Sequence, residues 1–297
     1  MAQSHRLTFV DPFRVIQSGG NPEEFDLVDK RCLAQGDSWF SIGSFPPGLT
    51  SNLLAQMELT RSVAVVNCAR PGIALAHMTD TSRQQTFLRL FAGRLAVKWD
   101  AILFSGGGND LIDAATVGPS VQPALRLLAT AAERGNGPLA GDDYISKPGW
   151  ETFRIHLTAV FDALVARRDS GINQRVPMVF HTYAHIMPRP APAGAGHGPW
   201  LQPSMLAFAV PQADWLAVSS ALMDRLADLF GALIAAHRAA DPQCGLYRVD
   251  SRNAGAIPAD PNEHGPSGDY LNEIHPTRVG YTKLAAAWRN PLDAIFA

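Results

Sequence analysis

Hydrophobic positions fall into two kinds of block along this chain: short apolar runs, and longer stretches with apolar residues at helical spacing. The short runs predict five strands, at about 29–35, 62–67, 100–104, 176–181 and 246–250. The run at 62–67 is rich in β-branched residues, which is typical of a parallel strand buried on both faces. Strands and helical stretches alternate, and this alternation predicts a parallel sheet with helices on both sides.

The longer stretches predict the helices between these strands. They cover about 49–60, 80–95, 123–134, 150–168, 213–240 and 277–288, with Thr277 as the N-cap of the last helix. Residues 1–28 contain several glycines and prolines and predict an irregular lead-in. The segment 183–215 is rich in the same residues and predicts an insertion, either a lid over a site or a surface loop. No repeat or low-complexity linker divides the sequence, so we expect one domain over 1–297.

The composition is that of an ordinary globular protein, with 297 residues, 46% hydrophobic, 18% charged and a formal net charge of -2. The near-neutral balance and the lack of basic clusters argue against a nucleic-acid partner. No stretch approaches the roughly 18 apolar residues that a membrane span needs. The first residues lack the apolar core of a signal peptide, so we expect a cytoplasmic location. The sequence does not indicate an oligomeric state.

The chain offers little that would hold a metal or a cofactor. Its three cysteines are an odd number at wide spacing, so neither a disulfide framework nor a metal site is indicated. Cys32 and Cys68 lie in apolar strand-like runs, where we expect them to be buried as small hydrophobic residues. His181, His185 and His197 lack the spacing of metal ligands. We therefore expect no metal and no cofactor.

Polar residues of chemical interest follow the ends of the predicted strands. Ser38 lies beyond the first strand, Asn109 beyond the third and His275 beyond the fifth. The carboxyl ends of parallel strands share one edge of the sheet, so these side chains are expected to converge there. A serine in a sharp turn after a strand is also how an α/β sheet presents a nucleophile. Each motif alone suits an ordinary turn, but together they indicate a catalytic site.

Four short blocks span nearly the whole chain in one order: Gly36-Asp37-Ser38, Gly72 after Asn67, Gly107-Gly108-Asn109-Asp110, and His275-Pro276 with Gly280-Tyr281. This set resembles the four blocks of the SGNH (GDSL-type) hydrolases. The resemblance implies a flavodoxin-like three-layer α/β/α fold with a central parallel five-stranded sheet, and serine-dependent ester hydrolysis. It also implies Ser38 as the nucleophile and His275 as the base. The oxyanion hole would consist of the backbone N–H groups of Ser38 and Gly72 and the side-chain amide of Asn109.

Ester hydrolysis needs these residue types. A serine hydroxyl is a weak nucleophile at neutral pH, so an imidazole must accept its proton as the new bond forms. Negative charge then develops on the substrate oxygen, and each fixed donor aimed at it contributes about 3–4 kcal/mol. An asparagine amide donates without losing its proton, and a glycine lets a backbone N–H approach closely. The glycine run at 106–108 lacks the Lys-Ser/Thr of a phosphate-binding loop, so we set that alternative aside.

The sequence departs from the family pattern beside the histidine. The family usually has an aspartate three residues before it, whereas this chain has Asn272. An asparagine offers one neutral acceptor oxygen, together with a donor that can hold the wrong imidazole tautomer. Three alternatives stay open: Asn272 orients His275 through its carbonyl oxygen, a backbone carbonyl or water does so, or Asp269 or Glu273 takes that place.

The sequence says less about the substrate. No arginine cluster lies near the motifs, so we expect a small to medium acyl ester of a neutral alcohol. Trp39 and Phe40, beside the serine, suit the core and an acyl pocket equally well. The leading hypothesis is a serine carboxylesterase that acts through an acyl-enzyme. The alternatives are a thioesterase or acyltransferase with the same site, and a non-catalytic ligand-binding protein on the same scaffold.

Overall fold

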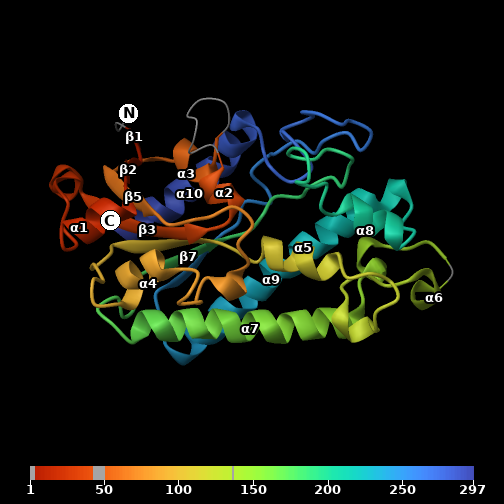
Figure 1. The fold of residues 1–297 in the computed structure, drawn as a ribbon, viewed down its shortest axis with the longest axis horizontal. Helices are drawn as coiled ribbons and strands as arrows, with labels where there is room; N and C mark the ends of the chain where they lie inside the picture. Colours follow the sequence, from red (N-terminus) through yellow and green to blue (C-terminus); the bar gives the residue numbers. More distant parts are fainter. Residues whose placement is uncertain (1–3, 43–50, 136) are drawn as a thin grey trace.

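A six-stranded parallel sheet forms the centre of the computed structural model within residues 4–42, 51–135 and 137–297, the part of the chain that the structure describes (Figure 1). Its strands are β2 (Thr8–Val10), β3 (Lys30–Gly36), β5 (Val63–Asn67), β6 (Ala101–Ser105), β7 (Met178–His181) and β8 (Leu246–Val249). They lie in the order β2-β5-β3-β6-β7-β8, and every neighbouring pair is parallel.

The predicted fold class is confirmed, with one strand more than expected. Strands β3, β5, β6, β7 and β8 correspond to the predicted runs and have the flavodoxin-like order 2-1-3-4-5. The prediction of five strands is wrong because β2 adds a further edge strand beside β5. β2 falls in the lead-in 1–28, which is therefore less irregular than predicted. This strand has only three residues, and Phe9 at its centre is 47% exposed. It is therefore too short and too exposed to give a recognisable pattern of apolar residues in the sequence.

Helices cover both faces of the sheet (Figure 1). The α-helices of the described residues are α1 (Pro12–Gln17), α2 (Ser38–Ser41), α3 (Leu53–Gln56), α4 (Gln85–Ala92), α5 (Gly108–Ala115), α6 (Ala131–Arg134), α7 (Lys147–Asp169), α8 (Gln202–Ala207), α9 (Trp215–Ala240) and α10 (Arg278–Phe296). In one layer α7 packs against α4 and α9, and in the other α10 packs against α3. This arrangement is the three-layer α/β/α architecture.

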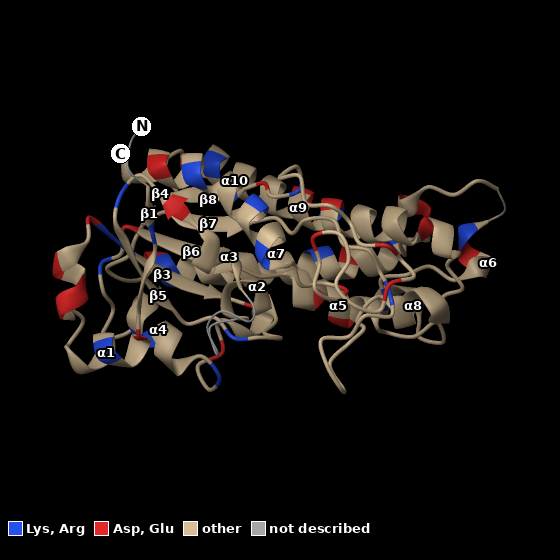
Figure 2. Cartoon of the chain, turned by 90° about the horizontal axis from the view of Figure 1, so that it is seen from above, with Lys and Arg blue, Asp and Glu red and all other residues tan. Residues whose placement is uncertain are grey.

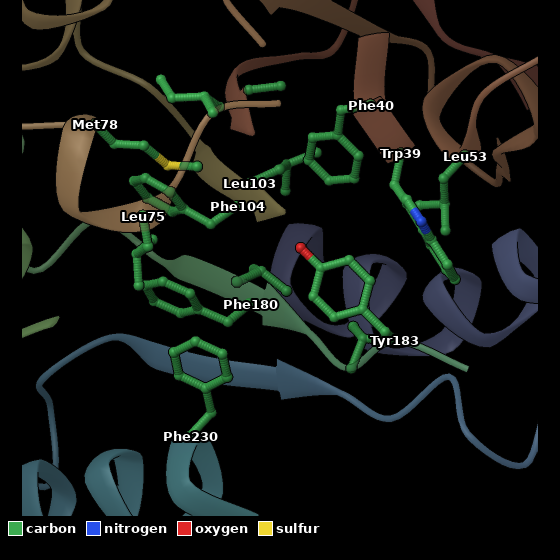
Figure 3. Packing of buried hydrophobic residues seen from close by; sticks show 14 of the residues in the cluster. Trp39, Phe40, Leu53, Leu75, Met78, Leu103, Phe104, Phe180, Tyr183 and Phe230 are labelled. Carbon is green, nitrogen blue, oxygen red and sulfur yellow. The ribbon is translucent and has the colours of Figure 1, made fainter. Parts of the chain in front are cut away.

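Aromatic side chains fill the space between the sheet and these layers. On one face Phe104 and Phe180 stack with ring centroids 4.9 Å apart, and Phe230 of α9 stacks on Phe180 at 5.6 Å. Figure 3 shows this column on one side of the sheet and Phe40, Trp39 and Tyr183 on the other. Successive residues of a strand point to opposite faces, so adjacent positions of one strand supply both cores.

Several predicted helix boundaries need correction. The helix over 49–60 is wrong in extent: α3 ends at Gln56 and is followed by the short strand β4 (Glu58–Leu59), which pairs with β1 (His5–Arg6). Positions 49 and 50 of the predicted helix lie outside the described residues. The helix over 80–95 is shorter, and α10 continues beyond 288 to Phe296. Thr277 caps α10 as predicted, accepting a hydrogen bond from the Gly280 N–H at 3.2 Å.

The segment 123–134 is not one helix. It contains a 3₁₀ turn at Pro123–Leu125 and the short helix α6, separated by extended residues. The buried Arg126 guanidinium lies at this break and donates to the carbonyl of Val121 at 2.8 Å and to the carboxylate of Glu133 at 2.5 and 2.7 Å. These bonds satisfy backbone and side-chain groups without a continuous helix, so the local sequence preference is overridden by tertiary contacts.

Charged residues are distributed over the whole length of the molecule, with acidic and basic positions interspersed (Figure 2). This distribution agrees with the small net charge of -2. Of the helices in the described ranges, none combines the length and the apolar character needed to cross a bilayer. The cysteines at 32 and 68 are buried, as predicted, and are free thiols.

Candidate active site

The proposed nucleophile lies in a tight turn between β3 and α2. Asp37 is the N-cap of α2, and its side chain accepts a hydrogen bond from the Trp39 N–H at 3.0 Å. Gly36 permits the close approach of β3 to β6, because a Cβ there would lie 2.7 Å from both the Cβ and the carbonyl oxygen of Ser105. Ser38 therefore becomes the first helical residue, at the carboxyl edge of the sheet.

The structure brings Ser38, His275 and Asn272 into one hydrogen-bonded line. The Nε2 atom of His275 lies 2.8 Å from the Oγ atom of Ser38, although the two residues are 237 positions apart. On the other side of the ring, Nδ1 lies 3.0 Å from the Oδ1 atom of Asn272. All three residues are buried, with Ser38 6% and His275 4% exposed.

The contacts of Asn272 determine the tautomer of His275. Its Oδ1 atom also accepts hydrogen bonds from the backbone N–H groups of Ile274 at 3.2 Å and His275 at 2.9 Å. A backbone N–H can only donate, so this atom is the amide oxygen and not the nitrogen. Nδ1 of His275 must then carry the proton, which leaves the Nε2 lone pair facing the hydroxyl of Ser38. Burial lowers the pKa of His275 to about 4, so the ring is neutral at neutral pH.

The two carboxylates considered as alternatives to Asn272 have other partners. Glu273 is fully buried and accepts hydrogen bonds from the backbone N–H groups of residues 200–202 and of Arg189. Burial raises the pKa of Glu273, and these four hydrogen bonds oppose that rise. Asp269 accepts from the Ile257 N–H at 2.7 Å and from Lys283 Nζ at 2.6 Å. The hydrogen bonds of both carboxylates therefore hold loops together and leave the imidazole to Asn272.

Asn109 lies beyond the third predicted strand, as expected, and in the first turn of α5, a helix that the hydrophobic pattern did not predict. Its Nδ2 atom donates to the carbonyl of Ile73 at 3.0 Å and so ties this turn to the loop after β5. An amide nitrogen has two protons, so one remains for a further acceptor. Gly72, next to Ile73, lies in an exposed turn with φ +74° and is not among the residues that line the cavity beside Ser38. Its place in an oxyanion hole stays a prediction.

A small cavity adjoins Ser38 and Asn109. Its volume is about 20 Å³, and it is lined by Asp37, Ser38, Trp39, Gly108, Asn109, Ile112, Tyr183, Ile186, Met223 and Ile274. The predicted insertion at 183–215 thus contributes Tyr183 and Ile186 to its wall. Trp200, from the same segment, packs against the His275 ring at a centroid distance of 5.3 Å and an interplanar angle of 87°.

A second buried polar network lies directly beneath Ser38, and sequence reasoning missed it. The Ser105 Oγ atom is 2.7 Å from Asp37 Oδ1 and 2.8 Å from His181 Nε2. The Tyr183 hydroxyl donates to the other oxygen of Asp37. Ser105 ends β6, while His181 ends β7 and Tyr183 follows it, so the rule that found Ser38 at a strand end would also have found these residues.

The contacts of this network call for one proton more than an ionised Asp37 and a neutral His181 provide. His181 Nδ1 lies 2.8 Å from the carbonyl of Thr182, which can only accept, so Nδ1 is protonated. With Nε2 unprotonated and Asp37 ionised, the single hydroxyl proton of Ser105 would face two acceptors. Both contacts are satisfied when Asp37 or His181 holds an additional proton. Burial raises the pKa of Asp37 to about 6 and lowers that of His181 to about 4, so Asp37 takes up this proton before His181 as the pH falls.

The histidines of the predicted insertion do not gather around a common point. His185 Nε2 lies 2.9 Å from the Oδ1 atom of Asp224, and His181 belongs to the network beneath Ser38. Over residues 4–42, 51–135 and 137–297, no group of three or more histidine, cysteine, aspartate or glutamate residues has the arrangement of a metal site.

Comparison with known proteins gives remote likenesses. No protein-family model and no curated protein matches this chain. Among solved structures, the chain is similar to a lipase from a goat rumen metagenome, with 14% identity over 88% of this chain and 96% of that one, and a TM-score of 0.48. It is also similar to phospholipase A1 from Streptomyces albidoflavus NA297, with 14% identity, 89% and 98% coverage and a TM-score of 0.45. An extracellular lipase from Streptomyces rimosus matches at 15% identity, 87% and 99% coverage and a TM-score of 0.43. Likenesses this remote carry no argument about activity, which therefore rests on the geometry of the site.

Proposed function

We propose that this protein is a serine ester hydrolase of the SGNH type, a carboxylesterase that cleaves small to medium acyl esters through an acyl-enzyme. Ser38 is the nucleophile, His275 the general base and Asn272 the group that orients the imidazole. The observation that carries the proposal is the line of hydrogen bonds from Ser38 through His275 to Asn272. The backbone contacts of Asn272 support the tautomer that general-base catalysis requires.

The proposed reaction has two halves. In the first, Ser38 Oγ attacks the ester carbonyl carbon while its proton moves to His275 Nε2, and the proton then passes to the departing alcohol. In the second, water attacks the acyl-enzyme carbonyl, His275 Nε2 accepts a water proton, and Ser38 Oγ regains a proton as the carboxylic acid leaves. Each half forms one C–O bond and breaks another, so the enzyme returns to its starting state.

Negative charge on the carbonyl oxygen needs donors that are already in place. The second amide proton of Asn109 is the donor that the structure best supports, because its first proton is bound to Ile73 and fixes the side chain. The backbone N–H groups of Ser38 and Gly72 complete the proposed oxyanion hole. Loss of one such donor costs about 10²–10³ in kcat, so Asn109→Ala is expected to lower kcat by that factor.

Labelling with a fluorophosphonate tests the proposal directly. We expect covalent modification of Ser38, located by mass spectrometry of the digested protein, together with hydrolysis of p-nitrophenyl esters. Ser38→Ala should abolish both. Hydrolysis that persists in Ser38→Ala would refute the serine mechanism, and absence of labelling would indicate a non-catalytic protein on this scaffold. Addition of thiols or alcohols as acceptors to the same assay distinguishes an acyltransferase from a hydrolase.

A further inference from the structure

The cavity beside Ser38 has a size that selects its acyl group. Its volume of about 20 Å³ compares with the 10–15 Å³ that a single water molecule needs by the same measure. Ser38 and Asn109 both line it, so it is the space next to an ester carbonyl held between these two residues, where the acyl substituent would lie. A space of this volume suits a group of the size of a methyl.

The side chains that line the cavity are buried and come from several helices and loops. Trp39, Ile112, Tyr183, Ile186, Met223 and Ile274 are each between 3% and 7% exposed. Asn109 and Ile112 are three residues apart on α5, so one helix face presents both the proposed donor and an apolar wall. The wall therefore has a fixed position relative to the reacting atoms.

Two close approaches hold the wall in place. Gly108 has no side chain where the Tyr183 ring lies, since a Cβ there would be 2.8 Å from the ring. Gly107, with φ +93°, packs against α9 in the same way, since a Cβ there would lie 3.2 Å from Leu226 and Phe230. Met223 is three residues before Leu226 on α9, and this packing keeps it against the start of α5. The cavity cannot deepen without a shift of α5 or α9.

We infer that this protein acts on acetyl esters, and that the small cavity bounded by Ile112, Ile186 and Met223 excludes longer acyl chains. This inference rests on the proposed serine hydrolase function. Each added methylene must displace a packed side chain, and overpacking of a well-filled core is unfavourable. One methylene changes the discrimination of an apolar pocket by about 10–200-fold, so a butyryl group should be disfavoured by at least tenfold.

The test compares kcat/KM for p-nitrophenyl acetate, butyrate and octanoate in the wild-type protein and in Met223→Ala. The wild type should prefer acetate to butyrate by at least tenfold, with octanoate slower still. Met223→Ala opens the wall and should raise the butyrate-to-acetate ratio by at least tenfold. The matched control is Met205→Ala, which removes the same atoms from a fully buried position that does not line the cavity. Its chain-length profile should equal that of the wild type.

The outcomes separate this inference from the function on which it rests. Fluorophosphonate labelling of Ser38 with equal or faster hydrolysis of butyrate would overturn the acetyl preference and leave the serine hydrolase in place. No labelling and no hydrolysis of any ester would overturn both. If Met223→Ala does not fold, as judged by its circular dichroism and thermal transition, Ile112→Val makes a smaller opening. An unchanged chain-length ratio in a folded Ile112→Val then counts against the cavity as the selecting feature.

Discussion

Replacement of Asn272 by aspartate should move the acid limb of the pH–rate profile. In the wild type His275 faces a neutral amide, and burial lowers its pKa to about 4. General-base catalysis requires the unprotonated ring, so kcat/KM should rise with pH through about 4 and level off above it. Asn272→Asp places a negative charge where the amide oxygen now lies, 3.0 Å from Nδ1. The charge favours the imidazolium and therefore raises the pKa of His275.

The size of this shift follows from Coulomb's law. Two unit charges about 4 Å apart attract by about 4 kcal/mol at an effective dielectric constant of 20, and one pKa unit corresponds to about 1.4 kcal/mol. Burial of the new carboxylate opposes part of this effect because it disfavours the ionised form of the aspartate. We therefore expect the acid limb to move upward by about two pH units in Asn272→Asp.

The assay is kcat/KM for p-nitrophenyl acetate from low to neutral pH, since this ratio reports ionisation of the free enzyme. Asn262→Asp is the matched control, because it makes the same chemical change on an exposed loop residue. The control should have the wild-type profile. An acid limb at the same pH in the wild type and in Asn272→Asp would refute the role given to Asn272. A wild-type limb near 6.5 would refute the neutral, desolvated imidazole.

Three further predictions concern the framework of the site. Gly36→Ala should cost about 1–3 kcal/mol of unfolding free energy and lower activity, because its Cβ would lie 2.7 Å from atoms of the neighbouring strand; a wild-type denaturation midpoint contradicts this. Glu273→Gln should lower the free energy of unfolding by about 1–3 kcal/mol, because one oxygen replaces two as acceptor for buried N–H groups; unchanged stability in urea denaturation contradicts it. Stability should also fall as the pH drops from about 6.5 to 4, because burial lowers the pKa of both His181 and His275 to about 4, so the unfolded chain binds protons at these two sites that the folded chain does not. Asp37 opposes this loss in part, because burial raises its pKa to about 6 and the folded chain binds a proton there. Urea titrations across this range that show no loss would refute it.

The sheet was predictable because its strands leave a strong local signal. Apolar runs such as Val63–Asn67 are buried along their length, and each predicted run became a strand of the sheet. Thr8–Val10 left no such signal because it is short and two of its three residues are exposed. The short elements around Arg126 were missed for a different reason, since hydrogen bonds to distant groups fix them and the local sequence does not.

The sequence indicated most residues of the candidate site, but it did not indicate the hydrogen bonds between them. Ser38, Asn109 and His275 follow strand ends, and this position together with the resemblance to the four SGNH blocks identified them. The choice among Asn272, Asp269 and Glu273 needed the structure, because all three lie within six residues of His275 and differ only in where a loop turns them. The polar network of Asp37, Ser105, His181 and Tyr183 was hidden because each residue also suits an ordinary strand end.

The strand order accounts for the positions of Ser38 and Asn109, whereas the position of His275 depends on loops. β3 and β6 are neighbours at the point where the order reverses, so Ser38 and Asn109 face the same crevice by topology. His275 arrives after β8, which β6 and β7 separate from β3. Its approach depends on the loop before α10, where the Asp269 carbonyl accepts from the Thr277 N–H at 2.7 Å and Glu273 binds residues 200–202. The distance between His275 and Ser38 therefore depends on the buried Glu273 carboxylate and on the backbone of Asp269. If His275 is the base, substitutions at Glu273 should lower kcat more than they alter the chain-length profile.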